Sequence, residues 1–349
     1  MRVLVTGGAG LIGYHAAMHY KNKGDQVDVM DNLERCDLLG HKVSPLRQLF
    51  NIDALKKAGV KWIKADVSDN DVFSHLDSSR DRYDYILHFA GQCGVPTSIE
   101  NPRRDMEVNY LGTFNVLEFA RRTGASVAFA STNKVYPIHD VFVKNEGKER
   151  WEFANRKWAL TGFPVTNDLE GSRTPYGASK YAADVLCQEY AHTYGVRTGV
   201  FRMSCIYGPN QVLSFSEQGW ASWFSLATLK GWPLTIYGDG DQVRDMLYAE
   251  DCVRAYDSFL SSNVKHGVWN LGGGVNNTIT LNRHLNLMER ITGKRSIVDY
   301  QDWRPADQKC YISDIRAIKK ELGWEPLVNP EEGLIKVTEF FKANLNIFE

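Results

Sequence analysis

The sequence predicts an α/β protein with a doubly wound parallel sheet, followed by a smaller α+β domain. Along residues 1–205 of the 349-residue chain, short apolar runs alternate with amphipathic stretches, the pattern of a parallel sheet covered by helices. A glycine-rich turn follows the first run and opens a helix. Residues 206–349 are mixed in character, and we expect them to form the smaller domain.

Six apolar runs are expected to become buried strands, because each is short and is bounded by glycine or polar residues. In chain order they are 2–5, 26–30, 62–65, 85–89, 126–130 and 198–202. Helices are expected over 12–23, 107–122 and 176–194. The run 269–273 is a candidate for a further strand that returns to the same sheet.

One segment, residues 137–172, does not fit this alternation. It is charged and contains Trp151, Phe153, Trp158 and Phe163. Long connections inside compact domains are usually functional or disordered, and four large aromatic side chains argue against disorder. We expect this insert to lie near the active site.

Composition and charge narrow the class of protein. The formal net charge is −1, which gives no electrostatic basis for binding nucleic acid. No apolar run approaches the ~20 residues of a membrane helix. Six cysteines are scattered without a C-x-x-C pair, and His15 and His19 lack the glutamate of the zinc-protease pattern. We therefore expect a reduced cytoplasmic protein without metal, nucleic-acid or membrane partners.

The glycine-rich turn predicts a dinucleotide site. Gly7, Gly10 and Gly13 follow a strand and open a helix, with Leu11 and Ile12 at the helix start. Glycines let the backbone approach a pyrophosphate, and the helix N-terminus supplies free N–H groups. The signal is stronger in this strand–helix context than the glycines alone would be.

The second strand supplies an acid for the same site. Asp31, followed by Asn32, lies 18 residues after Gly13 at the end of that strand. A carboxylate there accepts hydrogen bonds from a ribose 2′-hydroxyl and repels a 2′-phosphate, which favours NAD over NADP. Arg35 lies nearby in the sequence, so NADP remains an alternative cofactor.

A second constellation predicts proton and hydride transfer. Tyr176 and Lys180 lie four residues apart on an expected helix and share a face. An ammonium near a phenol favours the phenolate, so Tyr176 can take a proton from a sugar hydroxyl as hydride leaves the same carbon. Thr132 ends a strand, where its hydroxyl can bond the reacting oxygen. The same Tyr–Lys spacing alone also occurs on solvated helix faces.

These residues resemble an extended short-chain dehydrogenase/reductase that acts on nucleotide sugars, and the likeness covers almost the whole chain. The supporting motifs are 6–13, 66–67, 109–113, 131–132, 176–180, 207–209, 244–245, 304–307 and 322–326. The resemblance implies a Rossmann fold, NAD as cofactor and a nucleotide-sugar domain after residue 205. The further cofactor-binding residues that it implies are Asp66, Val67, Ala90, Gln92 and Asn109.

Within this family, several segments resemble the 2-epimerases that interconvert CDP-paratose and CDP-tyvelose. They are 90–92, 97–102, 131–136, 218–220, 223–224 and 242–245. The subfamily implies that Tyr176 takes the proton of the C2 hydroxyl while the hydride passes to NAD. The 2-keto sugar then turns, and the hydride returns to its other face. Cys205 stands where many relatives carry Asn.

The same resemblance implies a CDP-sugar substrate and a homodimer formed through helices near 107–122 and 177–194. The implied substrate-binding residues are Thr97, Ser98, Asn133, Arg202, Gln218, Trp220, Arg244 and Arg304. The two last-named arginines would hold the diphosphate, although salt bridges are an alternative role for them. The 137–172 insert and Trp220 with Trp223 would cover the sugar, and a plain core role for the tryptophans is an alternative.

Three other functions remain open on the sequence. One is another nucleotide-sugar epimerase, acting at C4 or at C2 of a different sugar. A 4,6-dehydratase is less favoured, because Asn133 and Lys134 follow Thr132 and no carboxylate is available to deprotonate C5. An NAD-binding redox sensor would be expected to have lost the Tyr176–Lys180 pair, which is intact here.

Overall fold

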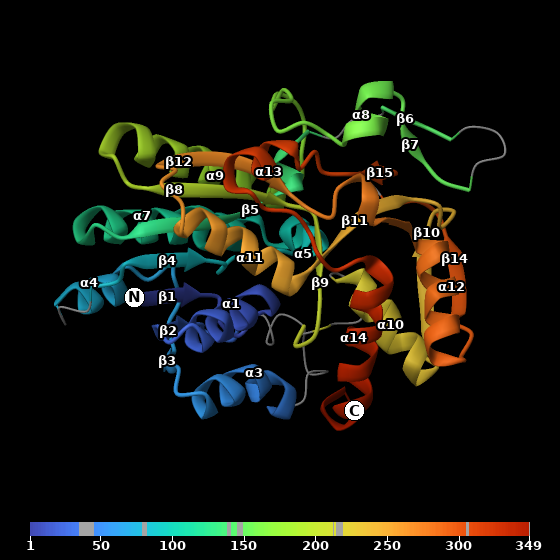
Figure 1. The fold of residues 1–349 in the computed structure, drawn as a ribbon, viewed down its shortest axis with the longest axis horizontal. Helices are drawn as coiled ribbons and strands as arrows, with labels where there is room; N and C mark the ends of the chain where they lie inside the picture. The colour runs from blue at the N-terminus through green and yellow to red at the C-terminus, as the bar shows by residue number, and fades with distance from the viewer. Residues whose placement is uncertain are drawn as a thin grey trace.

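The computed structural model describes residues 1–34, 45–78, 82–137, 141–144, 149–211, 213, 219–304 and 307–348. Its centre is a seven-stranded sheet with the order β12-β8-β5-β4-β1-β2-β3, in which every neighbouring pair is parallel (Figure 1). The strands are β1 Arg2–Thr6, β2 Gln26–Met30, β3 Lys61–Ile63, β4 Tyr85–His88, β5 Ser126–Thr132, β8 Thr198–Met203 and β12 His266–Leu271. The doubly wound fold predicted from the sequence is confirmed.

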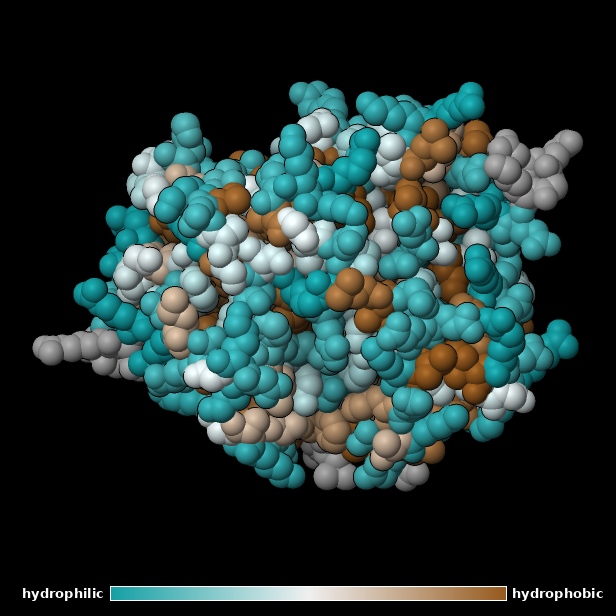
Figure 2. All heavy atoms as spheres, in the orientation of Figure 1, coloured by the Kyte–Doolittle hydropathy of each residue, from teal (hydrophilic) through white to brown (hydrophobic). Residues whose placement is uncertain are grey.

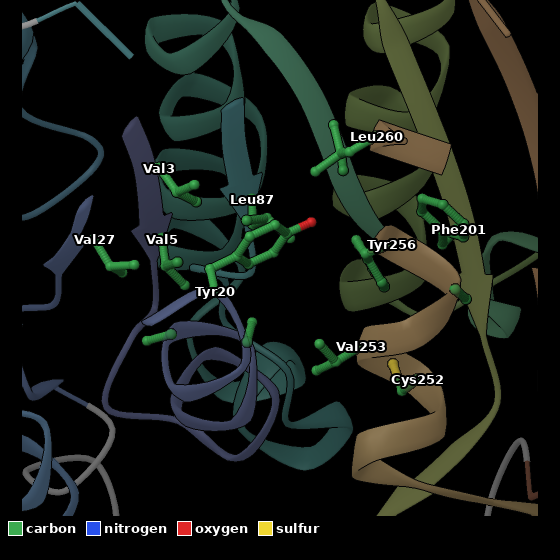
Figure 3. Close-up of a cluster of buried hydrophobic side chains, with 14 of the residues drawn as sticks. Val3, Val5, Tyr20, Val27, Leu87, Phe201, Cys252, Val253, Tyr256 and Leu260 are labelled. Carbon is green, nitrogen blue, oxygen red and sulfur yellow. The ribbon is translucent and has the colours of Figure 1, made fainter. Parts of the chain in front are cut away.

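Helices cover both faces of this sheet because the strand side chains alternate between the faces. In β1, Val3 and Val5 belong to one buried cluster and Leu4 to the other. Figure 3 shows the first cluster, with Val3 and Val5 of β1 on one side of Tyr20 of α1 and Tyr256 of α11 on its other side. The helices on this face are α1 Leu11–Asn22, α3 Pro45–Lys57, α11 Ala249–Leu260 and α13 Arg316–Leu322. Those on the other face are α4 Asn70–Ser78, α7 Gly112–Thr123 and α9 Pro175–Tyr194.

The helix expected over 107–122 is not continuous. The structure divides it into α6 Pro102–Asp105, a π-helical segment η1 Met106–Leu111, and α7. A Cβ on Gly112 would lie 2.6 Å from Val67 Cγ2, so the chain passes very close to the β3 loop there. Wider π-turns occur at functional sites because they redirect side chains, and Asn109 lies in this one.

The second region contains short sheets and helices beyond the carboxyl ends of the main strands. A four-stranded sheet joins β9 Cys205–Tyr207, β11 Val243–Tyr248, β13 Thr278–Thr280 and β15 Cys310–Tyr311, and a two-stranded sheet joins β10 Pro233–Tyr237 and β14 Ile297–Gln301. The helical elements are α10 Trp220–Lys230, η3 Val275–Asn277, α12 Leu281–Thr292, α14 Pro330–Ala343 and η4 Leu345–Phe348.

The two regions are interleaved in sequence. β12 pairs with β8 along its whole length and so belongs to the main sheet. Trp269 of β12 is fully buried in the same cluster as α11 and α13. Residues after 206 therefore contribute to both regions, and the division of the chain at 205/206 remains a prediction.

The described part of the 137–172 insert folds onto the second region beside β15 (Figure 1). It contains β6 Phe142–Val143, antiparallel to β7 Glu152–Phe153, and α8 Arg156–Thr161. Phe163 N–H donates to Ile312 O at 2.6 Å, and Phe153 and Phe163 are buried with Tyr136 and Tyr311. The aromatic residues of this insert therefore form a small core of their own.

The polarity of the outer surface is typical of a globular protein. The face shown in Figure 2 is mostly hydrophilic, with hydrophobic residues in small groups. Among the described residues, no helix is both long and apolar enough to cross a membrane.

Candidate active site

A cavity of about 470 Å³ lies at the carboxyl edge of the main sheet. The strand order reverses between β1 and β4, and open α/β sheets bind ligands at such a switch point. Its wall is built from the glycine loop, the ends of β2, β4, β5 and β8, the start of α9, and residues of the second region. The cavity thus brings together the two constellations that the sequence predicted separately.

The glycine loop forms a cradle that larger residues would fill. Gly7 has φ +72°, and a Cβ there would lie 2.6 Å from Ala90 N. A Cβ on Gly13 would collide with the carbonyl oxygen of Gly7. No side chain caps the start of α1 at Gly10, so the first N–H groups of this helix are available to a ligand. These features fit the pyrophosphate of a dinucleotide, and Gly7, Gly10, Leu11, Ile12 and Gly13 all line the cavity.

Acidic and amide side chains line the cavity beyond the glycine loop. Asp31 accepts the N–H groups of Ala9 at 2.9 Å and Leu33 at 2.8 Å, which ties the end of β2 to the glycine loop. Asn32 Nδ2 donates to Asp66 Oδ2 at 2.9 Å. Arg35, which bears on the choice between NAD and NADP, lies outside the described residues.

The surroundings of Asp66 favour the ionised form of its carboxyl group. Burial opposes the charge, but hydrogen bonds from Ser68 and Arg104 outweigh it and lower the pKa of Asp66. Arg104 also pairs with Glu34, so it links the end of β2 to the end of β3 across the cavity wall. Sequence reasoning missed Arg104, since nothing in its local pattern marks it.

Asn109 connects the segment after β4 to helix α9, which carries Tyr176 and Lys180. Its Nδ2 donates to Gln92 O at 3.0 Å and to Ser179 Oγ at 2.9 Å. Val67, Ala90 and Gln92 line the cavity, whereas Asn109 lies behind the wall and is fully buried. The π-helical segment therefore positions Asn109 to align α9 with the end of β4.

The three predicted catalytic residues meet on one wall of the cavity. Thr132, Tyr176 and Lys180 all line it. A Cβ on Gly177 would collide with the carbonyl oxygen of Lys134, so the first turn of α9 lies directly against the turn that follows Thr132. Thr174 caps the helix by accepting the Gly177 N–H at 3.2 Å. This packing holds the first turn of α9, which carries Tyr176, against the turn that follows β5.

Lys180 lies one turn further along α9 and is 5 % exposed. Burial lowers its pKa to about 8, against opposing contributions from Cys187, Cys93, Asp184 and Asp105. Its Nζ lies 4.2 Å from the centroid of the Phe129 ring. An ammonium enclosed in this way acts strongly on a nearby phenol, because little water screens it.

Asn133, Trp220 and Arg244 also line the cavity. Arg244 is paired with Asp307 at 3.1 Å. Arg304 is 45 % exposed and lines an adjoining cavity of about 270 Å³, with its guanidinium 3.6 Å from the Asp307 carboxylate. Gln218 lies outside the described residues.

Besides Arg304, three predicted substrate residues do not line the main cavity. Ser98 is buried in α5, Val95–Glu100, where its hydroxyl donates to Val95 O at 2.7 Å. Thr97 lies on the same short helix, away from the cavity wall. Arg202 is 3 % exposed and forms two 3.0 Å hydrogen bonds to the Asp184 carboxylate, so it joins β8 to α9.

Sequence reasoning missed two polar residues that line the same cavity as Asn133. Lys134 and Gln308 line the cavity and are hydrogen-bonded to each other at 2.7 Å. Lys134 follows Thr132 by two residues, in the turn η2 Asn133–Val135, so its position after a strand end could have marked it. No local pattern marks Gln308, which reaches the site only through the folding of the C-terminal segment.

The chain belongs to the NAD dependent epimerase/dehydratase family, whose model matches residues 3–272. NAD is therefore its cofactor, and the cradle at Gly7 and Gly13 fits it. The protein is an enzyme of the class that contains the NAD-dependent epimerases and dehydratases of nucleotide sugars.

Individual relatives agree on the class but differ in reaction. The chain is 31% identical to CDP-paratose 2-epimerase of Salmonella typhi, over 97% of this chain and 99% of that protein. It is 30% identical to UDP-glucuronate 4-epimerase of Thermodesulfobacterium geofontis, over 99% and 98% of the two chains. The crystal structure of Thermus thermophilus UDP-glucose 4-epimerase in complex with NAD is similar, with a TM-score of 0.76 and 29% identity over 99% of this chain and 100% of that chain.

Proposed function

We propose that the protein is a nucleotide-sugar 2-epimerase of the type that converts CDP-paratose to CDP-tyvelose. The observation that carries this proposal is the turn after β5, where Thr132 is followed by Asn133 and Lys134 on the cavity wall that also holds Tyr176. Thr132 and Tyr176, the groups that we propose for proton transfer, line the same cavity as the Asn133 amide and the Lys134 ammonium. The likeness to CDP-paratose 2-epimerase supports the choice of substrate.

The residues of the site divide the work of the reaction. Bound NAD supplies the hydride acceptor and, after reduction, the hydride donor. Tyr176 accepts the proton of the C2 hydroxyl and returns it at the end of the cycle. Lys180 favours the phenolate form of Tyr176, and the Thr132 hydroxyl donates a hydrogen bond to the oxygen on C2. Arg244 holds the diphosphate while the sugar turns between the two hydride transfers.

The same turn argues against dehydration. Removing water from a 4-keto sugar requires a base to take the C5 proton and an acid for the leaving hydroxyl. Asn133 has no acid–base function, and Lys134 is held by Gln308 rather than by a carboxylate. A 4-epimerase uses the same proton-transfer groups, so it is the alternative that an experiment must separate.

Proton NMR of purified protein with each nucleotide sugar separates these reactions. CDP-paratose and CDP-tyvelose are incubated separately, with no added cofactor. We expect each to convert into the other, and product formed in D₂O to carry no deuterium at C2, because the hydride returns directly. No conversion of either sugar would overturn the assignment and direct the search to other C2 and C4 epimer pairs. Substantial deuterium at C2 would overturn the direct return of hydride.

Replacement of Tyr176 tests the catalytic assignment. Tyr176→Phe should lower kcat by roughly 10²–10⁴-fold, because the proton then has no positioned acceptor. Bound NAD and the melting temperature should stay near wild-type values. Tyr181→Phe, in the next turn of α9, is the matched control and should keep its turnover. A Tyr176→Phe enzyme with normal kcat would contradict the role of this phenol and favour a sensor.

A further inference from the structure

Lys134 carries an ammonium group on the cavity wall, in the turn that follows Thr132. Its backbone N–H donates to Thr132 Oγ1 at 3.3 Å, and its Nζ donates to Gln308 Oε1 at 2.7 Å. Asn133 Nδ2 lies 3.5 Å from the same Gln308 oxygen. The amine is thus held in place by a neutral amide and not by a carboxylate.

Among the residues that the structure describes, none supplies Lys134 with a counter-ion of its own. Asp307 is the carboxylate that acts on it most strongly, but Asp307 is paired with Arg244 at 3.1 Å and lies 3.6 Å from Arg304. Burial and, after it, the charge of Arg244 lower the pKa of Lys134 to about 8, against the opposing charge of Asp307. Three cations thus share one carboxylate, and an anion bound among them would relieve their repulsion.

The position of Lys134 indicates which anion this is. Arg244 comes from β11 in the second region, whereas Lys134 comes from the same turn as Thr132. An anionic group that contacts Lys134 therefore lies close to the reacting carbon of the substrate. We propose that Lys134 binds the phosphate on C1 of the nucleotide sugar and thereby places C2 at Tyr176.

This proposal rests on the C2 epimerisation proposed above and supplies a physical reason for it. C1 and C2 are bonded directly, so a phosphate held next to Thr132 keeps C2 near the Thr132 hydroxyl. C4 lies across the ring from C1. A sugar presented through C4 would carry its phosphate away from Lys134 and leave the ammonium without its anion, which costs binding energy.

Nucleotide affinities test the phosphate contact without relying on turnover. Isothermal titration calorimetry on the NAD-loaded protein compares CDP with CMP, and UDP with UMP, for wild type and Lys134→Met. A charge-assisted hydrogen bond to the second phosphate predicts a loss of roughly 10- to 100-fold in diphosphate affinity. Monophosphate affinity should change by less than about threefold. Lys134→Arg should recover part of the loss, and Lys336→Met, at an exposed pair with Glu332, should match wild type.

Two results would overturn the phosphate contact. In one, Lys134→Met leaves the diphosphate affinity unchanged, which would assign the ammonium to a sugar hydroxyl or to structure. In the other, Lys134→Met lowers the affinities for the monophosphate and the diphosphate nucleotides equally. Because both bases are measured, a preference for UDP would correct the proposed substrate while leaving this test intact.

Proton linkage gives an independent measurement if Lys134→Met folds poorly. The titratable groups that act on Lys134 are Arg244, Arg304, Asp307 and Cys205, and the Cys205 thiol is neutral near pH 8 because burial raises its pKa to about 12. A bound phosphate raises the pKa of the ammonium, so CDP binding by the wild type near pH 8 should take up protons. Calorimetry in buffers of different ionisation enthalpy measures this uptake. Gln308→Met, which frees the amine from its amide partner, should keep it, and zero uptake in both proteins would overturn the proposal.

Steady-state kinetics test whether the contact also positions C2. With saturating CDP-paratose, Lys134→Met should lower kcat at least tenfold as well as raise KM, because the misplaced C2 no longer faces Tyr176. A raised KM with unchanged kcat would limit Lys134 to binding and overturn its positioning role. If the wild type converts neither CDP-sugar, the proposed function fails, while the nucleotide affinities still decide the phosphate contact.

Discussion

Asp105 is a buried carboxyl group that the proposed chemistry does not use. It ends α6, its side chain is fully buried, and neither carboxylate oxygen has a hydrogen-bond partner among the described residues. Burial raises its pKa to about 6, against an opposing contribution from the Lys180 ammonium. A carboxyl group with a raised pKa weakens the folded state at neutral pH, because folding favours its protonated form.

Asp105→Asn should therefore stabilise the protein at pH 7. Between the usual carboxyl pKa and about 6, the folded state binds more protons than the unfolded state, so stability falls as pH rises through this range. The neutral variant should gain about 1–2 kcal/mol of unfolding free energy at pH 7. Urea denaturation at several pH values measures this gain, which should shrink steadily toward pH 4. A gain that does not depend on pH would show that the charge of Asp105 is not its cause.

At the scale of single elements, the glycine loop shows how closely the backbone of the site is packed. Gly10 and Gly13 both lie at the start of α1, but they differ in the space around them. A Cβ on Gly13 would collide with the carbonyl of Gly7, whereas one on Gly10 would lie 3.3 Å from that oxygen. Only a Cβ on Gly13 would therefore force the loop to move.

Gly13→Ala should consequently lose both stability and cofactor. The displaced loop costs about 1–3 kcal/mol, and the purified variant should contain much less NAD than the wild type. Gly10→Ala is the matched steric control for stability, with a change below about 1 kcal/mol. Thermal melting together with the absorbance of extracted cofactor measures both effects. Equal behaviour of the two variants would contradict a steric role for Gly13.

The elements also show what could be predicted from the sequence. Buried strands and the glycine turn were predicted because their signals are local: apolar runs of the right length and glycines at a strand end. The π-helical segment was not predicted, because a widened turn leaves no periodicity of its own and depends on the approach of Gly112 to Val67.

The residues of the site divide in the same way, into those marked by a local sequence signal and those brought in only by tertiary structure. Tyr176 and Lys180 are four residues apart on one helix, so their proximity could be read from spacing. Lys134 meets Gln308 across 174 positions of chain, and Arg202 meets Asp184 by the packing of β8 on α9. Contacts of this kind depend on tertiary structure and have no local signature.

At the scale of the whole molecule, an exposed apolar surface supports the homodimer that we propose. Leu111 is 48% exposed, Phe114 is 40% exposed and Val185 is 44% exposed. The first two lie at the junction of η1 and α7, and the third lies on α9. These are the helices through which the dimer was expected, and apolar side chains left in water there would gain by association.

Charge placed on this surface should separate the subunits. The double variant Leu111→Glu with Phe114→Glu should sediment as a monomer at micromolar concentration, where we expect the wild type to sediment as a dimer. Leu160→Glu on α8, where the leucine is 69% exposed, is the control and should remain dimeric. Sedimentation velocity measures all three. A wild type that is monomeric at micromolar concentration would contradict the dimer itself.

The interleaving of the two regions also has a mechanical consequence. The chain leaves the main sheet after β8, returns in α11 and β12, leaves again into β13, and comes back in α13. Opening on a hinge requires few connections, whereas here every crossing strand would have to bend together. Because the connections resist such an opening, we expect a bound dinucleotide to leave through local loosening of the cavity walls. The proposed epimerase cycle ends with its cofactor in the starting redox state, so it would gain from slow cofactor release, because no fresh molecule is needed between turnovers.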